Sequence, residues 1–471
     1  MLHRILLVLG YLGLTLFVVG VTVALVAYGN DYAYDFSTHK IIQKGHIILQ
    51  STPRGLVVTA DGKRLHKKTP YQAAFTVGQH RLSLEDAGYW PWQKTLSVVA
   101  GQVTLAQYVI LVPKKPVASV LDSRTQIVAQ SMSKDHRHLA YITGGPDAAL
   151  YTLDLGNPKP VKLYTPAAAT AGAGAETLTG VTWSDDASHL LVSSTINGQP
   201  EYRLVSASGG TPLDLTGQYQ ENFSGLQFSS GNWQQLYWIS ADGLRRLDVG
   251  AQTISGVLAD HVSQFWVIAG RVLYVQQTDL GQSLWSLDSH DKHQELIPAL
   301  PASPSYAVTY TTYLDQDELA VVPSATGTGT LYSDIFGDTP VAKTIAHNVT
   351  DASFSPDGHA VAFTGPNVIV TYDLEASQIQ NRMVRYNIVD QPGSLSALTW
   401  FDDYHMLVTR GNELYWCEYD GTNRVDLGAV AAGLPAYSVI SSDPKALVEF
   451  AAAAAGVRVT QLQIVVPSSG F

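Results

Sequence analysis

The sequence has little cysteine and little charge. Cys417 is the single cysteine among 471 residues, so no disulfide can form within the chain and no cysteine cage can hold a metal. Charged residues make up 15% of the chain and the net charge is −11, whereas soluble proteins typically carry ~25% charged residues. An acidic chain without a basic stripe argues against nucleic acid as a partner, and against anionic headgroups beyond a membrane anchor. Stability must therefore come from buried apolar cores.

One long uncharged run stands at the N-terminus. Residues 5–27 contain no charge, and a helix of that length spans roughly 35 Å, enough to cross a hydrocarbon core of about 30 Å. A secretory signal has a shorter apolar region that ends in small residues, so we expect an uncleaved transmembrane helix; a buried core helix is the alternative. His3 and Arg4 precede the run and Asp31 and Asp35 follow it. This asymmetry predicts that residues 1–4 are cytoplasmic and residues 28–471 extracytoplasmic.

Short apolar runs separated by turn residues follow a juxtamembrane linker at 28–44. Residues 45–113 are predicted to form a small antiparallel β-sandwich, because every strand is short and every gap carries Gly, Pro or Asp. The pair Asp61-Gly62 supplies a tight turn. Trp90 or Trp92 is expected to be buried in the core of the sandwich, because aromatic side chains dominate small β cores. Residues 114–116, Lys-Lys-Pro, form the linker to the next domain.

Six landmarks in this region resemble the PEGA domain in order and spacing. The landmarks are Ser51-Thr52-Pro53-Arg54-Gly55, Asp61-Gly62-Lys63, Thr69-Pro70, Gly78-Gln79-His80, Gly88-Tyr89 and Gly101. The tetrad that gives the family its name is Pro53-Arg54-Gly55-Leu56 here, so its Glu and Ala are replaced. The resemblance implies a spacer or adhesion module of a cell envelope, and the family offers no catalytic residues to transfer. The lead-in before Gly45 also resembles that of membrane-anchored proteins of candidate-phylum bacteria.

Residues 117–467 repeat a pattern of apolar strands around an acidic turn. The period of about 38–50 residues is typical of four-stranded propeller blades. The best copy, residues 354–363 (FSPDGHAVAF), resembles the blade motif of WD-like and Tol-type propellers. We expect an all-β protein with a propeller of eight blades, or alternatively seven. The last copy supplies only three strands, so Val117–Leu121 is predicted to pair with Val457–Val465 and close the ring.

Acidic groups and histidine pairs are the candidates for chemistry. The groups Asp185/Asp186, Asp402/Asp403 and Asp315/Asp317/Glu318 all fall at the predicted blade turns, where aspartate accepts backbone hydrogen bonds; calcium binding is the alternative. His136/His138 and His290/His293 are predicted to lie in polar loops and to be solvated, without a third ligand for zinc. We therefore predict no catalytic, cofactor-binding or metal-binding residues and no cofactor.

Two functions remain open after these exclusions. The first is a non-enzymatic, membrane-anchored envelope protein, in which residues 5–27 hold the membrane and the propeller binds a protein or a cell-wall glycan. The second is an extracytoplasmic propeller enzyme, a hydrolase or lyase acting on envelope glycan. A propeller supports both kinds of function, so the choice depends on the site.

Overall fold

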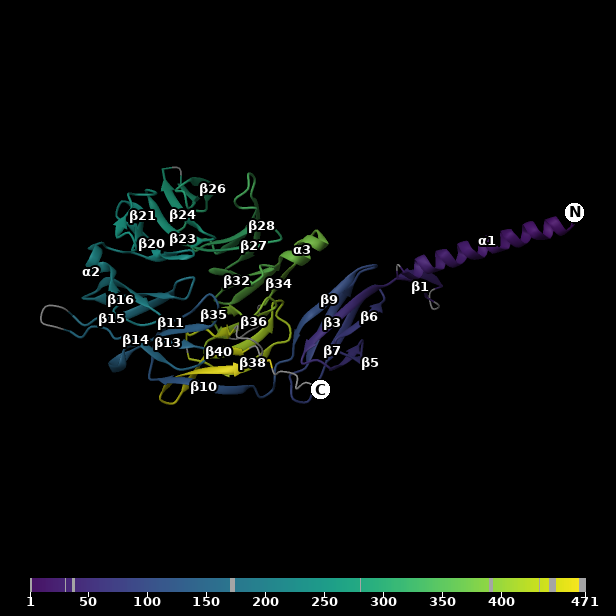
Figure 1. The fold of residues 1–471 in the computed structure, drawn as a ribbon, viewed down its shortest axis with the longest axis horizontal. Helices are drawn as coiled ribbons and strands as arrows, with labels where there is room; N and C mark the ends of the chain where they lie inside the picture. The colour runs from purple at the N-terminus through teal and green to yellow at the C-terminus, as the bar shows by residue number, and fades with distance from the viewer. Residues whose placement is uncertain are drawn as a thin grey trace. The chain divides into compact units, whose positions relative to one another are not determined.

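The chain forms two compact units, one built on the residues up to Pro116 and the other on Val117–Ile464 (Figure 1). The computed structural model describes residues 2–29, 31–35, 39–169, 174–279, 281–388, 393–431, 433–439 and 446–465. The last residues of the predicted propeller, 466 and 467, lie outside these ranges. Each unit is described below by itself.

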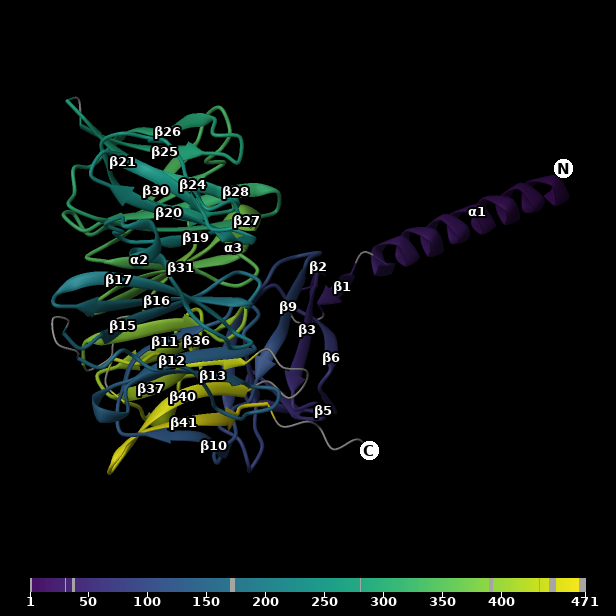
Figure 2. The same cartoon turned by 60° about the vertical axis from the view of Figure 1, so that its left-hand side comes forward.

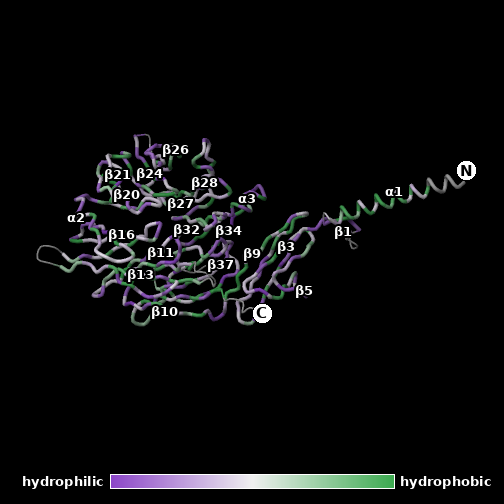
Figure 3. Tube along the Cα trace, viewed as in Figure 1, coloured by the Kyte–Doolittle hydropathy of each residue, from purple (hydrophilic) through white to green (hydrophobic). Residues whose placement is uncertain are grey.

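The predicted membrane-spanning segment is helical. Helix α1 (Leu2–Gly29) extends the predicted segment by a few residues at each end. Its stretch Leu9–Gly29 has a mean hydropathy of 2.3, and the hydropathy along the chain is coloured in Figure 3. None of this stretch is buried inside the protein. The hydroxyls of Thr15 and Thr22 donate to carbonyls four residues earlier, at 2.9 and 2.8 Å, so these polar groups are satisfied within the helix.

The segment predicted as a plain linker, residues 28–44, carries an ordered two-stranded ladder. Strand β1 (Tyr32–Asp35) pairs antiparallel with β2 (Lys40–Gln43). Tyr32 and Tyr34 alternate with other residues in β1, which is a strand pattern, and the prediction of a linker overlooked it because each strand has only four residues.

The predicted sandwich is confirmed, with one pair of strands that runs parallel. The first and last strands, β3 and β9, pair in parallel, so the unit is not purely antiparallel. Turn spacing does not reveal such pairing, because it joins strands far apart in sequence. One sheet has the order β6-β3-β9 and the other β5-β4-β7-β8. The strands are β3 (Gly45–Thr52), β4 (Val57–Ala60), β5 (Lys63–Lys68), β6 (Tyr71–Phe75), β7 (Gly78–Leu84), β8 (Trp92–Val98) and β9 (Val103–Ile110).

Strand β5 was not predicted, because five of its six residues are Lys, Arg or His. It lies at the edge of its sheet and is largely exposed, which suits charged residues and protects the edge from pairing with other chains. The turn before it, at Asp61 and Gly62, has both residues at positive φ, 49° and 77°, as a two-residue hairpin requires.

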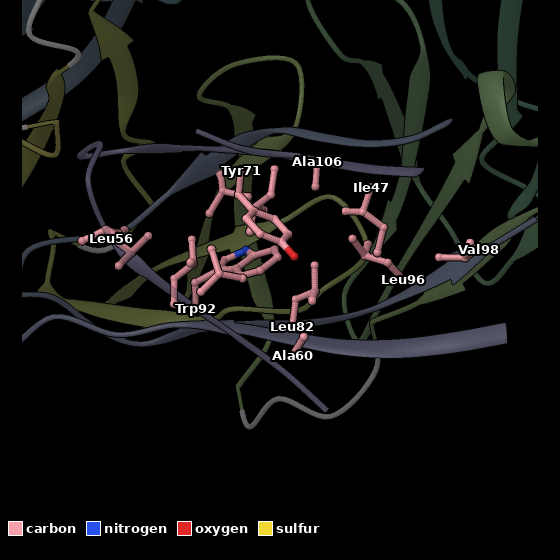
Figure 4. Packing of buried hydrophobic residues seen from close by; sticks show 14 residues of the cluster. Ile47, Leu56, Ala60, Tyr71, Leu82, Trp92, Leu96, Val98 and Ala106 are labelled. Carbon is pink, nitrogen blue, oxygen red and sulfur yellow. The ribbon is translucent and has the colours of Figure 1, made fainter. Parts of the chain in front are cut away.

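Trp92 occupies the centre of the sandwich core (Figure 4). It is 1% exposed and belongs to one cluster with Tyr71, Leu56 and Leu82 from both sheets. Trp90 is 44% exposed, two residues earlier. The prediction that one of the two rings is buried is therefore confirmed for Trp92.

The second unit contains eight four-stranded sheets among the residues that the structure describes, which confirms the count of eight blades. In each of the first seven blades the four strands follow in chain order, as in β11-β12-β13-β14. The first blade consists of β11 (Ile127–Met132), β12 (His138–Thr143), β13 (Ala149–Asp154) and β14 (Val161–Tyr164), with the 3-10 helix η1 (Gly145–Asp147) between β12 and β13. The second consists of β15 (Thr177–Trp183), β16 (His189–Ile196), β17 (Gln199–Ser206) and β18 (Leu213–Asp214), and α2 (Leu215–Tyr219) follows it. The third consists of β19 (Gln227–Ser229), β20 (Asn232–Ser240), β21 (Gly243–Asp248) and β22 (Thr253–Ile254), and the fourth of β23 (Val262–Ile268), β24 (Arg271–Thr278), β25 (Gly281–Leu287) and β26 (His293–Leu300).

The eighth blade joins the two ends of the unit. Its order is β10-β41-β40-β39, so the first strand of the unit becomes the outermost strand of the last blade, and the predicted closure is confirmed (Figure 2). The fifth blade consists of β27 (Tyr306–Tyr313), β28 (Gln316–Pro323), β29 (Thr328–Ser333) and β30 (Val341–His347). The sixth consists of β31 (Asp351–Phe354), β32 (Ala360–Gly365), β33 (Val368–Asp373) and β34 (Arg385–Asn387), with α3 (Leu374–Gln380) between the last two strands. The seventh consists of β35 (Leu395–Trp400), β36 (His405–Arg410), β37 (Glu413–Glu418) and β38 (Val425–Ala429), and the eighth of β39 (Tyr437–Val439), β40 (Ala446–Ala453), β41 (Gly456–Gln463) and β10 (Val117–Arg124).

The core of the propeller lies between neighbouring blades. In β28, Leu319 and Val321 pack with the fourth blade, whereas Ala320 and Val322 pack with the sixth. A strand covered on both faces needs apolar residues at every position, which explains continuous runs such as Leu319–Val322 in the repeats.

Candidate functional site

The turn between the first and second strands carries a recurrent hydrogen-bond pattern in three blades. Ser355 Oγ donates to Asp357, and that carboxylate accepts the backbone N–H of His359 at 3.0 Å. Ser355 Oγ in turn accepts the backbone N–H of Ala360 at 3.1 Å. In the first blade, Ser133 Oγ donates to Asp135, which accepts the backbone N–H of Arg137, and Ser133 Oγ accepts that of His138. In the second blade, Ser184, Asp186, Ser188 and His189 make the same three bonds. The first role of these aspartates is thus to shape the turn.

In each of the two acidic doublets, one aspartate bonds within its own turn and the other bonds to a neighbouring blade. Asp402 accepts the backbone N–H groups of Tyr404 and His405, at 3.0 and 2.9 Å, and caps its own turn. Asp403 reaches the sixth blade, where it accepts the backbone N–H of Asp357 at 3.0 Å. In the other doublet, Asp186 caps its turn and Asp185 accepts from Lys134 Nζ of the first blade at 3.0 Å. The turn interpretation is confirmed for both doublets, and each second contact is a link between blades.

The third acidic group is only partly in a turn. Leu314 and Asp315 both have positive φ, 48° and 60°, and form a two-residue hairpin turn. Strand β28 starts at Gln316, so Asp317 and Glu318 lie within the strand, and the prediction that they belong to the turn is wrong. Tyr310 donates a hydrogen bond to Asp317, and Ser333 Oγ donates to Glu318 at 2.8 Å. Burial raises the pKa of the Glu318 carboxyl.

Carboxylates of the sixth and seventh blades act on three neighbouring side chains. Asp357 and Glu375 act on Tyr313, His359 and Tyr404, whereas Asp373 acts on Tyr313 and His359, and Asp403 on His359 and Tyr404. The carboxylates are Asp357, Asp373, Glu375 and Asp403, and we call them, with Tyr313, His359 and Tyr404, the acidic cluster. Tyr313 comes from the fifth blade, so the cluster is assembled from three blades. Sequence patterns missed it as a unit, because its members belong to separate copies of the repeat.

The ionisation of the cluster follows from burial and negative charge. Burial raises the pKa of Tyr313 to about 12, with further contributions from Glu375 and Asp357. Burial alone would lower the pKa of His359, but the hydrogen bond and charge of Asp357, whose Oδ1 is 2.8 Å from Nδ1, raise it overall. Burial and the charges of Asp357 and Asp402 raise the pKa of the Asp403 carboxyl. The carboxylate charges thus contribute to raising the pKa values of Tyr313, His359 and Tyr404 alike, as a negative local potential does.

In the first two blades, lysine and arginine pair with acidic residues beside the turns. Lys134 pairs with Asp185 at 3.0 Å and Arg137 with Asp154 at 3.0 Å. Among the described residues, the ion pair made by Asp357 is with His359 and that made by Asp402 is with His405. A negative surface that also presents tyrosine rings is suited to a cationic group.

The histidine pairs do not form metal sites. No group of three or more His, Cys, Asp or Glu side chains in the described part of the chain is placed to hold a metal ion. His290 and His293 are exposed, as predicted. The prediction of loops is wrong for His138 and His293, which are the first residues of strands β12 and β26. His136 is half-buried, and its Nδ1 lies 3.0 Å from the carbonyl oxygen of Ser438 in the eighth blade, so the prediction of a solvated side chain is wrong there. Its turn lies against the seam where the ring closes, which sequence spacing does not reveal.

The single cysteine is not a reactive group. Cys417 is buried in β37, and burial raises the pKa of its thiol to about 12. The thiolate, which is the nucleophilic form, is therefore scarce near neutral pH.

The comparison with known families concerns the sandwich. Residues 44–111 match the PEGA domain. This match confirms the resemblance found in the sequence, within two residues at each end. The PEGA domain here consists of strands β3 to β9, and Trp92 is the largest side chain of its core.

Solved structures similar to the chain are propellers. The Dos1 propeller has 12% sequence identity and a TM-score of 0.47, and the match covers 76% of this chain and 96% of that one. Sqt1 of Saccharomyces cerevisiae has 12% identity and a TM-score of 0.47, with 75% and 98% covered. The Swd1 propeller domain of Myceliophteria thermophila has 12% identity and a TM-score of 0.41, with 74% and 100% covered. No curated protein matches the sequence.

Proposed function

We propose that this chain is a single-pass membrane protein of a bacterial cell envelope whose propeller binds a protein partner. Helix α1 anchors it, residues 1–4 are cytoplasmic, and residues 28–471 are extracytoplasmic. The length, hydropathy and exposure of Leu9–Gly29 support the anchor. His3 and Arg4 on one side of the helix and Asp31 on the other support the orientation. The PEGA domain spaces the propeller from the membrane.

The observation that carries the binding role is the convergence of the exposed Asp357 and Glu375 with the half-buried Asp403 and the two tyrosines of the acidic cluster, whereas Asp373 is buried and caps α3. Such a surface attracts a lysine, an arginine or a free amine of a partner and presents rings on which the cation can rest. A neutral cell-wall glycan would gain little from this charge, so the cluster favours a protein with a basic segment.

Binding of a fluorescent lysine decapeptide to the detergent-solubilised full chain tests this role by anisotropy. The double variant Glu375→Gln/Asp403→Asn removes two charges and leaves Asp357, which caps its turn, unsubstituted. The amide oxygen introduced at position 403 can still accept the backbone N–H of Asp357. We expect its affinity to fall by about fivefold or more, and the affinity of the native chain to weaken as salt rises. The matched control is Asp242→Asn, an exposed acid in the third blade whose ion pair with Arg245 is 3.4 Å long. Equal binding by the native chain and the double variant would overturn the role of the cluster.

We further propose that the protein is not an enzyme. Asp357 is committed to hydrogen bonds with Ser355 and His359, which leaves it poorly suited to proton transfer. One observation favours the alternative of a glycan hydrolase or lyase: the raised pKa of Asp403 resembles that of a general acid. Release of soluble fragments from purified cell wall by the native chain, lost in Asp403→Asn, would support the enzyme and contradict our proposal.

Protease treatment of intact cells tests the orientation. We expect added protease to digest the chain beyond Tyr28 without lysis. Full protection until the cells are lysed would place the propeller in the cytoplasm instead.

A further inference from the structure

One face of the ladder that follows α1 presents two tyrosines and an isoleucine to solvent. Tyr34 lies directly opposite Ile41 and Tyr32 opposite Gln43, so alternation places Tyr32, Tyr34 and Ile41 on the same face as the half-buried Gln43. These side chains are 44%, 49% and 71% exposed. Tyr34 also contacts His39, with 3.3 Å between the hydroxyl and Nδ1.

The ladder is fixed to the PEGA domain. A two-stranded ladder is marginally stable by itself, but Asp31 connects this one at two points. Its carbonyl oxygen accepts the backbone N–H of Lys44 at 2.9 Å, and its carboxylate lies 2.9 Å from Nε2 of His46 in β3. Lys44 in turn accepts the backbone N–H of Gly101 at 2.9 Å. The ladder therefore moves with the domain.

The ladder also begins where the helix ends. The backbone N–H of Asp31 donates to the carbonyl oxygen of Tyr28 at 3.2 Å. Tyr28, in the last turn of α1, is 81% exposed. If α1 spans the bilayer, the side chains of Tyr28, Tyr32, Tyr34 and Ile41 come at the boundary between lipid and water. Tyrosine is enriched at that boundary, where its ring is in apolar surroundings and its hydroxyl is hydrated.

We propose that Tyr28, Tyr32, Tyr34 and Ile41 form a lipid-docking face that inserts into the interfacial zone of the bilayer and holds the PEGA domain against the membrane surface. This inference rests on the membrane anchor of the proposed function. The contacts of Asp31 and Lys44 transmit the docking to β3, so the domain stands at a fixed height instead of swinging on a linker.

The charge of the segment identifies which property of lipid is recognised. Between Tyr28 and Gln43 the sequence has two aspartates and one lysine, whereas recognition of anionic headgroups uses clusters of basic residues. The docking face therefore recognises the interfacial zone common to all bilayers, and anionic lipid adds nothing.

Spin labels on the full chain test the proposal in phosphatidylcholine vesicles with and without phosphatidylglycerol. A Cys417→Ala background removes the native thiol, and single labels replace Tyr34, Ile41, Val19 in the middle of α1, and Thr95. Thr95 is an exposed residue of β8 and is the aqueous control. The ratio of the collision rates of each label with oxygen and with a water-soluble nickel complex reports the depth of that label in the bilayer.

We expect Val19 deep in lipid, Tyr34 and Ile41 at the interface, and Thr95 in water, with the same depths in both vesicles. Val19 in lipid with Tyr34 and Ile41 fully in water would overturn the docking face and leave the anchor intact. Val19 in water would overturn the anchor itself. Dipolar broadening between Tyr34 labels without exposure to lipid would show that a second copy covers the face and would overturn the proposal. A depth that changes with phosphatidylglycerol would overturn the assignment to uncharged interface.

Discussion

The sandwich gathers its core in a single cluster beneath two sheets, whereas the propeller distributes its core over the interfaces between successive blades. In the sandwich, Trp92 touches both sheets, so one side chain joins most of the unit. In the propeller, each cluster joins only two neighbours, as β28 does with the fourth and sixth blades. The sandwich therefore depends on one residue, and the propeller depends on the closure of its ring.

Closure is the point at which the propeller is most vulnerable. Strand β10 pairs with β41 through its backbone, and its side chains reach the first blade. The guanidinium of Arg124 lies 3.8 Å from the ring centre of Tyr151, and Tyr141 donates to Asp122. One strand thus connects the last blade to the first by two independent kinds of contact.

The largest effect is expected from removal of this strand. A soluble chain that begins at Lys115 should be monomeric, whereas one that begins at Arg124 should aggregate, because β41 becomes an open edge. Hydrogen exchange should rise in residues 456–463 and not in β32 of the sixth blade. Size-exclusion chromatography and exchange measured by mass spectrometry provide the test. Equal melting temperatures for the two chains would show that the ring closes without β10.

The second largest effect is expected from removal of the Trp92 side chain in the core of the sandwich. Trp92→Ala should cost about 3–5 kcal/mol of unfolding free energy, because a large cavity opens in the core. Trp90→Ala is the matched control and should cost less than about 1 kcal/mol, since Trp90 is 44% exposed. Chemical denaturation followed by circular dichroism measures both. Similar losses for the two variants would show that the core is not centred on Trp92.

A buried acid in the eighth blade gives an effect that depends on pH. Glu449 is 6% exposed, its Oε2 has no hydrogen-bond partner in the described part of the chain, and burial raises its pKa to about 7. The folded state therefore holds the proton more tightly than the unfolded state does. The stability from this group is fully present below the unfolded pKa near 4.5 and is lost as pH rises through 7.

The difference in unfolding free energy between the native chain and Glu449→Gln isolates this effect. Between pH 5 and pH 8 we expect the native chain to lose about 2.5 kcal/mol relative to the variant. The pKa of His359 is also raised, so this residue too lowers the free energy of unfolding as pH rises, and the subtraction removes its contribution. Glu85→Gln, at an exposed site of the sandwich, is the control and should track the native chain. Parallel pH profiles for the native chain and Glu449→Gln would contradict the prediction.

The two units also differ in what their sequences reveal. The blades were predictable because a strand buried on both faces repeats an apolar run, and the three-strand final copy indicated the closing strand. The parallel pairing of β3 with β9 was not predictable, since no local pattern marks a contact between strands that are far apart in the chain. Strand β5 was missed because an edge position tolerates Lys and Arg that strand propensities disfavour.

The candidate site shows the same limit. Asp357, Asp402 and Asp403 were recognised as turn residues from their place in the repeat. The convergence of Asp357 and Asp403 with Glu375 and Tyr313 depends on which blades become neighbours and how α3 is placed, and no single copy of the repeat contains that information. Links between blades are tertiary properties of the ring.

The smallest effect concerns a side-chain link across the seam of the ring. His136 has positive φ, 53°, and its Nδ1 lies 2.9 Å from Oγ and 3.0 Å from the carbonyl oxygen of Ser438. Asparagine tolerates positive φ but is too short to keep these contacts, so His136→Asn should cost about 1 kcal/mol. His290→Asn, at an exposed position, should be neutral within about 0.5 kcal/mol. Because the backbone pairing of β10 carries most of the closure, hydrogen exchange in residues 456–463 should stay unchanged in His136→Asn. A rise there as large as that caused by removing β10 would show that side chains, and not the backbone ladder, hold the ring closed.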